Sequence, residues 1–201
     1  MLKVELSGIT RSYGRSKVCH NVNLILTPGS ATALIGPNGS GKSTLLKIIA
    51  GYTTPQQGTI RWSLAGHNLP ISSISHHLSF CSPAVQLPVS LTVEETIRLH
   101  FILRKAAIPE AEVVKFLQLP AKKLLSALSS GMMQRLKLGL ALFTQSDLLL
   151  LDEPTMNLDS SWKKEYLHWI TPYLGKRTIV IASNDESEYA FCSQIFPLSD
   201  G

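Results

Sequence analysis

The sequence predicts an α/β fold with a parallel sheet at its core, a small antiparallel sheet before it and a helical insertion. Residues 31–35 form a short apolar run that leads into a glycine-rich turn and then into a helical pattern over residues 42–50. Residues 147–151 and 178–182 are two more apolar runs, typical of parallel strands covered on both faces. Residues 92–143 carry apolar side chains at helical spacing instead, which indicates the insertion.

The N-terminal part of the chain has the pattern of strands. Residues 2–6 alternate apolar and polar side chains, and residues 22–26 form a second candidate strand that ends in a turn at residues 27–30. Residues 58–62 and 78–81 have strand composition as well. The segments 2–6 and 22–26 are expected to form a small antiparallel sheet at the start of the chain.

The helical insertion is expected to begin at Thr92. Thr92 and Glu95 have the spacing of a capping box, in which each side chain bonds the backbone of the other residue at a helix N-terminus. Helical character continues over residues 110–119 and 131–143. These segments predict a mostly helical region between the parallel strands.

The chain is long enough for one compact domain and too short for two catalytic domains. We expect residues 1–83 and 146–201 to form an α/β core and residues 84–145 to form a helical subdomain. Residues 1–5 include a carboxylate where a secretory signal would place its apolar core, and no stretch reaches the roughly 18 apolar residues that span a membrane. These features predict a cytoplasmic protein that forms no membrane pore itself.

Net charge and cysteine content indicate which kinds of ligand and site the chain can have. The net charge of +5 suits an anionic ligand such as a nucleotide, but the scattered Lys and Arg residues argue against a nucleic-acid partner. Cys19, Cys81 and Cys192 are far apart and odd in number, so neither a disulfide framework nor a zinc site is indicated. His76 and His77 have no acidic or cysteine companion, which favours a solvated loop over a metal site.

A phosphate-binding loop is indicated between the predicted strand and helix. Its residues satisfy the pattern GxxxxGK[ST] and are, in order, Gly36, Pro37, Asn38, Gly39, Ser40, Gly41, Lys42 and Ser43. Glycines let backbone N–H groups turn inward around phosphate oxygens, and the helix start adds the positive end of its dipole. We expect Lys42 to reach the β- and γ-phosphates, Ser43 to ligate Mg²⁺ and Thr44 to border the nucleotide. A glycine-rich turn before an ordinary helix is the alternative.

Two adjacent carboxylates, Asp152 and Glu153, follow the apolar run at residues 148–151. They would lie at the C-terminal end of a buried parallel strand, which is where such sheets bind ligands. Asp152 is expected to hold Mg²⁺ through water, and Glu153 to orient or deprotonate the water that attacks the γ-phosphorus of ATP. An Asp-Glu-Pro turn is common in loops by itself, and it gains this meaning from the phosphate loop upstream.

The segment between these two motifs resembles LSGGQ, the signature of ABC (ATP-binding cassette) ATPases. It consists of Leu128-Ser129-Ser130-Gly131-Met132 followed by Gln134-Arg135, and Asn157-Leu158-Asp159 resembles the D-loop of the same family. The resemblance extends over essentially the whole chain. It implies a P-loop NTPase (RecA-like) core with an N-terminal antiparallel β-subdomain and an inserted α-helical subdomain that carries the signature.

The resemblance also implies a composite site. Two identical or similar cassettes would form a head-to-tail dimer in which Ser129 and the Gly131 backbone of one contact the γ-phosphate of ATP held by the other, near Asp159. Without its neighbouring motifs, the signature segment would be better interpreted as a Ser-Gly helix cap. Tyr13 stands where the family places an aromatic ring that stacks on adenine, although a surface tyrosine in a turn has the same pattern.

Two positions depart from the family pattern. Asn184 stands where a histidine usually contacts the γ-phosphate, and an amide can donate a hydrogen bond but cannot be protonated. Pro83 stands where the Q-loop glutamine usually contacts Mg²⁺, and the nearby Gln86 is a candidate substitute. We expect ATP binding and dimer closure to be retained with slower turnover. The changed Q-loop can equally reflect an unusual membrane partner.

The resemblance implies an ATP-binding and ATP-hydrolysing subunit of an ABC transporter. It would use ATP and Mg²⁺ and act peripherally, on the cytoplasmic face of the membrane, with a separate transmembrane permease subunit. A soluble ABC ATPase for assembly or remodelling, of the iron–sulfur or ribosome-associated type, is one alternative. A slow regulatory cassette is another, suggested by Pro83 and Asn184, but the presence of Glu153 argues against it.

Overall fold

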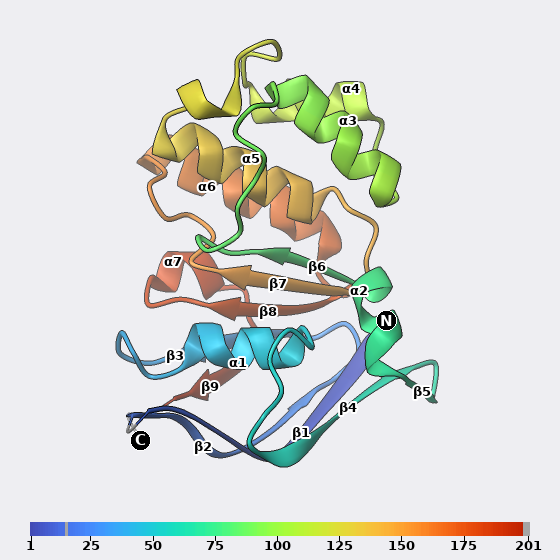
Figure 1. Cartoon of the computed structure of the whole chain (residues 1–201), viewed down its shortest axis with the longest axis vertical. Coiled ribbons are helices and arrows are strands. Elements are labelled where there is room, and N and C mark those ends of the chain that lie inside the picture. The colour runs from blue at the N-terminus through green and yellow to red at the C-terminus, as the bar shows by residue number, and fades with distance from the viewer. Residues whose placement is uncertain (15, 199–201) are drawn as a thin grey trace.

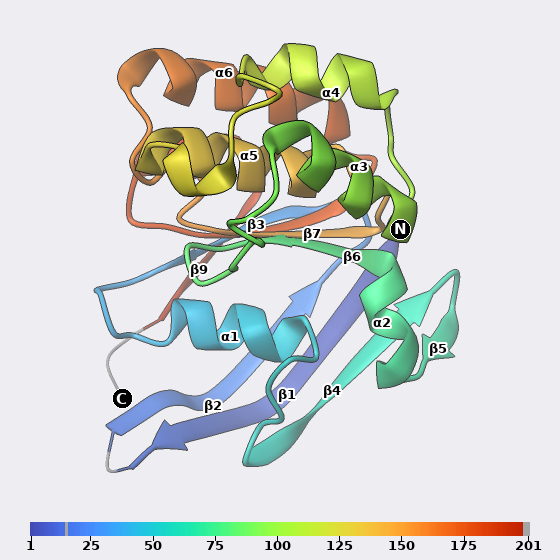
Figure 2. The same cartoon turned by 45° about the horizontal axis from the view of Figure 1, so that its top comes forward.

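The structure is a computed structural model that describes residues 1–14 and 16–198 and has the predicted α/β architecture. Helix α1 lies between an antiparallel sheet and a parallel sheet (Figures 1 and 2). A layer of helices covers the face of the parallel sheet that points away from α1. The antiparallel sheet contains, in spatial order, β2 (Ser16–Leu26), β1 (Leu2–Tyr13), β4 (Gln57–Leu64) and β5 (His67–Leu69). The parallel sheet contains β6 (Leu78–Cys81), β7 (Leu148–Asp152), β8 (Thr178–Ala182), β3 (Ala31–Ile35) and β9 (Gln194–Pro197).

The helices occupy the connections between these strands. They are α1 (Lys42–Ile49), α2 (Ile71–His77), α3 (Val93–Leu103), α4 (Glu110–Leu117), α5 (Ser130–Leu142), α6 (Ser160–Ile170) and α7 (Glu186–Tyr189), with 3₁₀ turns η1 (Leu125–Ala127) and η2 (Thr171–Tyr173). The expected strands and helices are all present. The elements α2, α6, α7, β5 and β9 are additional to those expected from the sequence.

The antiparallel sheet contains the N-terminal strands expected from the sequence, but they are longer. Alternate residues of the first half of β1 are buried, as the alternation of apolar residues predicts. Val4 pairs with Leu26 of β2 on one side and with Trp62 of β4 on the other. The predicted strand at residues 58–62 therefore belongs to this sheet.

The parallel sheet separates two apolar cores. Every residue of β7 and β8 is buried, as expected for strands with side chains packed on both faces. Leu148 and Leu150 face the core that contains α1 and the antiparallel sheet, while Leu149 and Leu151 face the core beneath the helical layer. In the order β7-β8-β3, the end of β7 lies close to the end of β3. The topology thus brings Asp152 to the edge of the sheet where the phosphate loop begins.

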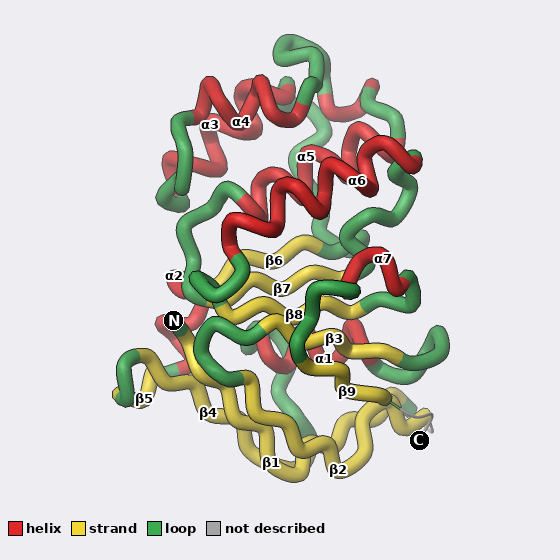
Figure 3. The backbone as a smooth tube through the Cα atoms, turned by 180° about the vertical axis from the view of Figure 1, so that it is seen from behind, coloured by secondary structure: helices red, strands yellow, loops and turns green. Residues whose placement is uncertain are grey.

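The helical layer contains α5 and α6 next to the parallel sheet and α3 and α4 farther out (Figure 3). The capping box at the start of α3 is confirmed. The Glu95 N–H donates to Thr92 Oγ1 at 3.3 Å, and the Thr92 N–H donates to Glu95 Oε2 at 2.8 Å. Helices α3, α4 and α5 fall within residues 84–145. The division of the chain at those boundaries stays a prediction.

The expectation of a solvated loop at His76 and His77 is wrong. Both residues lie in the last turn of α2, and His77 Nδ1 is 2.9 Å from Asp147 Oδ2. The contact with Asp147, which directly precedes β7, holds the His77 ring against the sheet instead of in a solvated loop. Within residues 1–14 and 16–198, no group of three or more His, Cys, Asp or Glu residues is placed to hold a metal ion.

The three cysteines are free thiols in the structure. Cys19 and Cys81 are buried and Cys192 is partly buried. Burial raises the pKa of the Cys19 thiol to about 11 and the pKa values of the Cys81 and Cys192 thiols to about 12. Such thiols stay protonated near neutral pH and are therefore poor nucleophiles.

Candidate functional site

The phosphate loop connects β3 to α1 and has a backbone shape that glycine permits. The φ angle is 150° at Gly36, 92° at Gly39 and 95° at Gly41, values that residues with a Cβ rarely adopt. Gly41 also lies so close to β2 that a Cβ there would meet the carbonyl oxygen of Val18 at 1.8 Å. The loop can keep this place against β2 only with glycine at position 41.

The loop borders a cavity of about 290 Å³. The cavity is lined by Val18, Asn38, Gly39, Gly41, Lys42, Ser43, Thr44 and Glu153. The Lys42 ammonium group donates to the carbonyl oxygens of Gly36 at 2.6 Å and Pro37 at 3.1 Å. The hydroxyl of the buried Ser40 has no hydrogen-bond partner among the described residues. A buried ammonium group and an unpartnered hydroxyl are donors that phosphate oxygens would satisfy.

The Asp152 carboxylate is almost fully buried, and each of its oxygens accepts a hydrogen bond from a hydroxyl group. Ser43 Oγ donates to Oδ1 at 2.9 Å, and Ser82 Oγ donates to Oδ2 at 2.9 Å. Ser43 comes from the start of α1 and Ser82 from the end of β6, so the contacts join three parts of the site. Hydroxyl and carboxylate oxygens are ligands that hard divalent cations take.

Glu153 follows β7 in a tight turn and lines the cavity at the phosphate loop. Its φ angle is 47°, and its N–H donates to the Ala182 carbonyl oxygen at 2.9 Å. Gln134 Nε2, from α5, donates to the carbonyl oxygens of Glu153 at 3.3 Å and Pro154 at 2.8 Å. Burial, and after it the negative charge of Glu188, raises the pKa of the Glu153 carboxyl above its ordinary value, while the charge of Lys42 opposes the rise.

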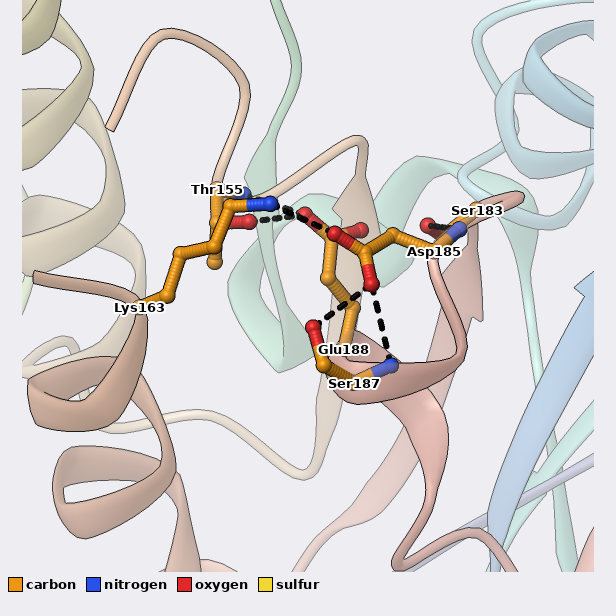
Figure 4. A network of polar contacts seen from close by, with 6 residues as sticks. All are labelled: Thr155, Lys163, Ser183, Asp185, Ser187 and Glu188. Carbon is orange, nitrogen blue, oxygen red and sulfur yellow. Dashed lines mark hydrogen bonds and ion pairs between the residues drawn. The ribbon is translucent and has the colours of Figure 1, made fainter. Parts of the chain in front are cut away.

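A polar network supports the turn after Glu153 (Figure 4). The buried Glu188 accepts hydrogen bonds through Oε1 from the N–H of Thr155, at 2.8 Å, and from the Thr155 hydroxyl. Lys163 Nζ lies 2.6 Å from Asp185 Oδ2, which joins α6 to the start of α7. The Lys163 ammonium group and the Ser187 hydroxyl lower the pKa of the Asp185 carboxyl to about 2. The carboxylate is therefore ionised near neutral pH.

Asn184 lies against the phosphate loop. Its amide oxygen accepts from Lys42 Nζ at 3.1 Å, and its Nδ2 donates to Asn38 Oδ1 at 3.0 Å. Beside it is a second cavity of about 800 Å³, lined by Asn38, Glu153, Met156, Asn184, Asp185 and Glu186. The structure therefore brings Lys42, Glu153 and Asn184 together, although they lie far apart in the sequence.

A protein-family model for ABC transporters matches residues 19–156, which include the phosphate loop, the signature and the carboxylate pair. The chain belongs to the ABC transporter family. The dimeric structure of MJ0796, a bacterial ABC transporter cassette, is 25% identical with a TM-score of 0.84 and covers 98% of this chain and 95% of that chain. The fold is therefore that of an ABC cassette.

Two curated relatives show the same membership. The sulfate/thiosulfate import ATP-binding protein CysA of Mesostigma viride is 34% identical over 197 residues, which are 93% of this chain and 56% of the relative. The ABC transporter G family member 23 of Dictyostelium discoideum is 34% identical over 214 residues, which are 98% of this chain and 30% of the relative. This ABC cassette spans about half of the first relative's length and about a third of the second's.

The signature residues of this ABC cassette contact other parts of the chain than the phosphate loop. Ser129 caps α5 by accepting the Met132 N–H at 3.2 Å, and a Cβ at Gly131 would lie 2.8 Å from the Asn157 carbonyl oxygen. Asp159 caps α6. The residues that line the two cavities include neither the signature residues nor Asp159.

Tyr13 also lies outside the residues that line the loop cavity. Its ring is half exposed, and the guanidinium carbon of Arg11 is 4.9 Å from the ring centroid. Tyr13 ends β1 and pairs with Ser16 of β2, the strand that borders the phosphate loop at Val18. Tyr13 thus lies on the strand that pairs with β2, and β2 borders the loop.

Ser82, Gln134 and Glu188 are site residues to which no motif in the sequence assigns a role. Ser82 has no motif of its own, and Glu188 contacts a turn distant in the sequence. Only Gln134 carries a signal, because it belongs to the signature segment. Gln86, the candidate substitute for the Q-loop glutamine, is exposed and lines neither cavity.

Proposed function

We propose that this chain is the ATP-binding and ATP-hydrolysing subunit of an ABC transporter and drives transport through a separate membrane subunit. One observation carries the proposal: Lys42, Asp152 and Glu153 converge at the phosphate loop. The name of the Mesostigma viride relative supports it, since that protein is described as an import ATP-binding protein.

The loop would bind the phosphates of ATP. They would replace the loop carbonyls as partners of Lys42, whose ammonium group would then contact the β- and γ-phosphates. Ser43 and Asp152 would hold Mg²⁺, because their hydrogen-bonded oxygens already lie together. Mg²⁺ would offset the negative charge that develops on the phosphates. Glu153 would accept a proton from the attacking water, a role that its raised pKa suits.

The signature would act on ATP held by a second cassette. Ser129 and Gly131 lie at the exposed N-terminal end of α5, where a helix dipole favours an anion. A head-to-tail dimer would bring this end to the partner's γ-phosphate, with Asp159 nearby. The dimeric arrangement of the MJ0796 cassette supports this step.

The remaining contacts would concern the base of ATP and the membrane. Tyr13 would stack on adenine, since its ring is half exposed on the strand that pairs with β2, which borders the loop. No helix within residues 1–14 and 16–198 is long and apolar enough to cross a membrane. As the ATP-binding role in the name of the Mesostigma viride relative suggests, the chain would act peripherally, on the cytoplasmic face of the membrane, bound to a permease subunit.

Three measurements on the purified chain test the proposal: equilibrium ATP binding, phosphate release and sedimentation. We expect Mg·ATP to bind, phosphate to be released, and a dimer to form in the presence of ATP. Lys42→Ala is the control, because it removes the ammonium group at the loop and should lose ATP binding. A wild-type chain that binds no ATP would contradict the proposed function.

Asn184→His is expected to speed ATP cleavage by about tenfold or more, because a protonatable side chain at this position can assist charge or proton transfer in the transition state. The Asn184 amide already reaches Lys42 and Asn38, so an imidazole would start close to the γ-phosphate site. Single-turnover rates measured by rapid quench report the effect. Asn184→Gln, which retains an amide, should show no gain, and an unchanged rate in the histidine variant would refute slow turnover caused by Asn184.

A further inference from the structure

Ser82 occupies a buried position at the end of β6, directly before the proline that replaces the Q-loop glutamine. Ser82 is only 1% exposed, and its hydroxyl donates to Asp152 Oδ2 at 2.9 Å. Ser43 donates to the other oxygen of the same carboxylate at 2.9 Å. Asp152 is therefore held from two sides by hydroxyl groups.

The turn after Ser82 fixes the direction of this hydrogen bond. The Val85 N–H donates to the Ser82 carbonyl oxygen at 3.1 Å, and Pro83 takes the second position of the turn, where the fixed φ angle of proline fits. The Ala84 N–H donates to Ser82 Oγ at 3.3 Å. With that N–H as its donor, the hydroxyl points its own hydrogen at Asp152.

Pro83 and Gln86 are poorly suited to replace the missing glutamine themselves. Pro83 has neither a backbone N–H nor a polar side chain, and its carbonyl oxygen already accepts from Lys137 Nζ at 3.0 Å. Gln86 is exposed and lines neither cavity at the site. Ser82 is the Q-loop residue that contacts Asp152 directly.

We infer that Ser82 completes the Mg²⁺ site of this cassette in place of the Q-loop glutamine. It acts as a positioning residue: its hydroxyl holds Oδ2 of Asp152, which keeps Oδ1 turned toward Ser43 Oγ. Groups that orient a metal ligand in this way commonly raise the affinity of the site for its metal, although they do not contact the ion. The inference rests on the proposed function, since it requires that Mg·ATP binds at the phosphate loop.

Ser82→Ala tests the inference through metal binding. Mn²⁺ in place of Mg²⁺ is titrated into the chain saturated with a non-hydrolysable ATP analogue, and protein-bound Mn²⁺ is followed by electron paramagnetic resonance. We expect Mn²⁺ affinity to fall by about 10- to 100-fold, the usual loss when a partner of a metal ligand is removed. Affinity for the analogue in EDTA should stay at the wild-type value, because no phosphate-loop contact is removed.

Gln86→Ala is the matched control and should bind Mn²⁺ as the wild type does. If Ser82→Ala fails to fold, Ser82→Thr and Ser82→Val repeat the comparison. Threonine keeps the hydroxyl, and valine has the shape of threonine without a hydroxyl. The threonine variant should bind Mn²⁺ more tightly than the valine variant. Wild-type Mn²⁺ affinity in Ser82→Ala, or a loss in Gln86→Ala, would overturn the inference. A wild-type chain that fails to bind the analogue would instead refute the proposed function.

Discussion

Glu153→Gln is expected to slow ATP turnover by about 100- to 10,000-fold, the range that a positioned general base contributes. Glutamine has nearly the same shape, but its amide cannot accept a proton from the attacking water. The backbone at position 153 should keep its place, because Ala182 and Gln134 hold its N–H and carbonyl groups. Phosphate release at saturating ATP measures the rate, and a separate titration measures ATP affinity, which should be retained.

The same variant should accumulate an ATP-dependent dimer, because closure no longer leads to hydrolysis. Sedimentation with and without ATP detects it. Glu165→Gln is the matched control, since it removes an exposed carboxylate from α6, outside both cavities, and should turn over at the wild-type rate. Turnover in Glu153→Gln equal to that of the control would contradict the role of Glu153 as the base.

Local patterns in the sequence predict much of the fold. The phosphate loop depends on closely spaced glycines, the capping box on Thr92 and Glu95, and the parallel strands on short apolar runs. In each of these cases the physical cause lies within a few residues. This explains why the strand, loop and helix from residue 31 to residue 50 appear where the sequence places them.

Contacts between segments that are distant in the sequence cannot be predicted from local patterns. Ser43 and Asp152 are 109 positions apart, and Lys42 and Asn184 are 142 apart, so only the strand order brings them together. The resemblance to the family anticipated these two pairs by role. It carried no signal for Ser82, whose contact with Asp152 depends on the pairing of β6 with β7.

The elements that were not expected have physical reasons too. β9 is a short edge strand whose residues are only partly buried or exposed, so it lacks the apolar run of its neighbours. Asp159 illustrates a different difficulty, because one side chain can serve two purposes. Its carboxylate accepts the N–H groups of Ser161 and Trp162 and so starts α6, whereas the family pattern had pointed to the nucleotide alone.

Gly41→Ala is expected to destabilise the chain and to abolish ATP binding. Alanine at a φ angle of 95° costs about 1–3 kcal/mol in backbone strain. The added Cβ would also lie 1.8 Å from the carbonyl oxygen of Val18, and relief of such overpacking costs about 1–3 kcal/mol more. The relief must move either β2 or the loop, and Lys42, which follows directly, would move with the loop. Urea unfolding without nucleotide measures the loss of stability, and an ATP titration measures the loss of binding.

Gly39→Ala separates the two causes. Its φ angle of 92° is nearly the same as that of Gly41, but a Cβ at Gly39 would have nothing within 4 Å. Gly39→Ala should therefore lose only the strain contribution, and the free energy of unfolding should be lower in Gly41→Ala by about 1–3 kcal/mol, the cost of overpacking. Equal losses in the two variants would mean that β2 yields without cost, and the close approach of Val18 would then not be what requires glycine at position 41.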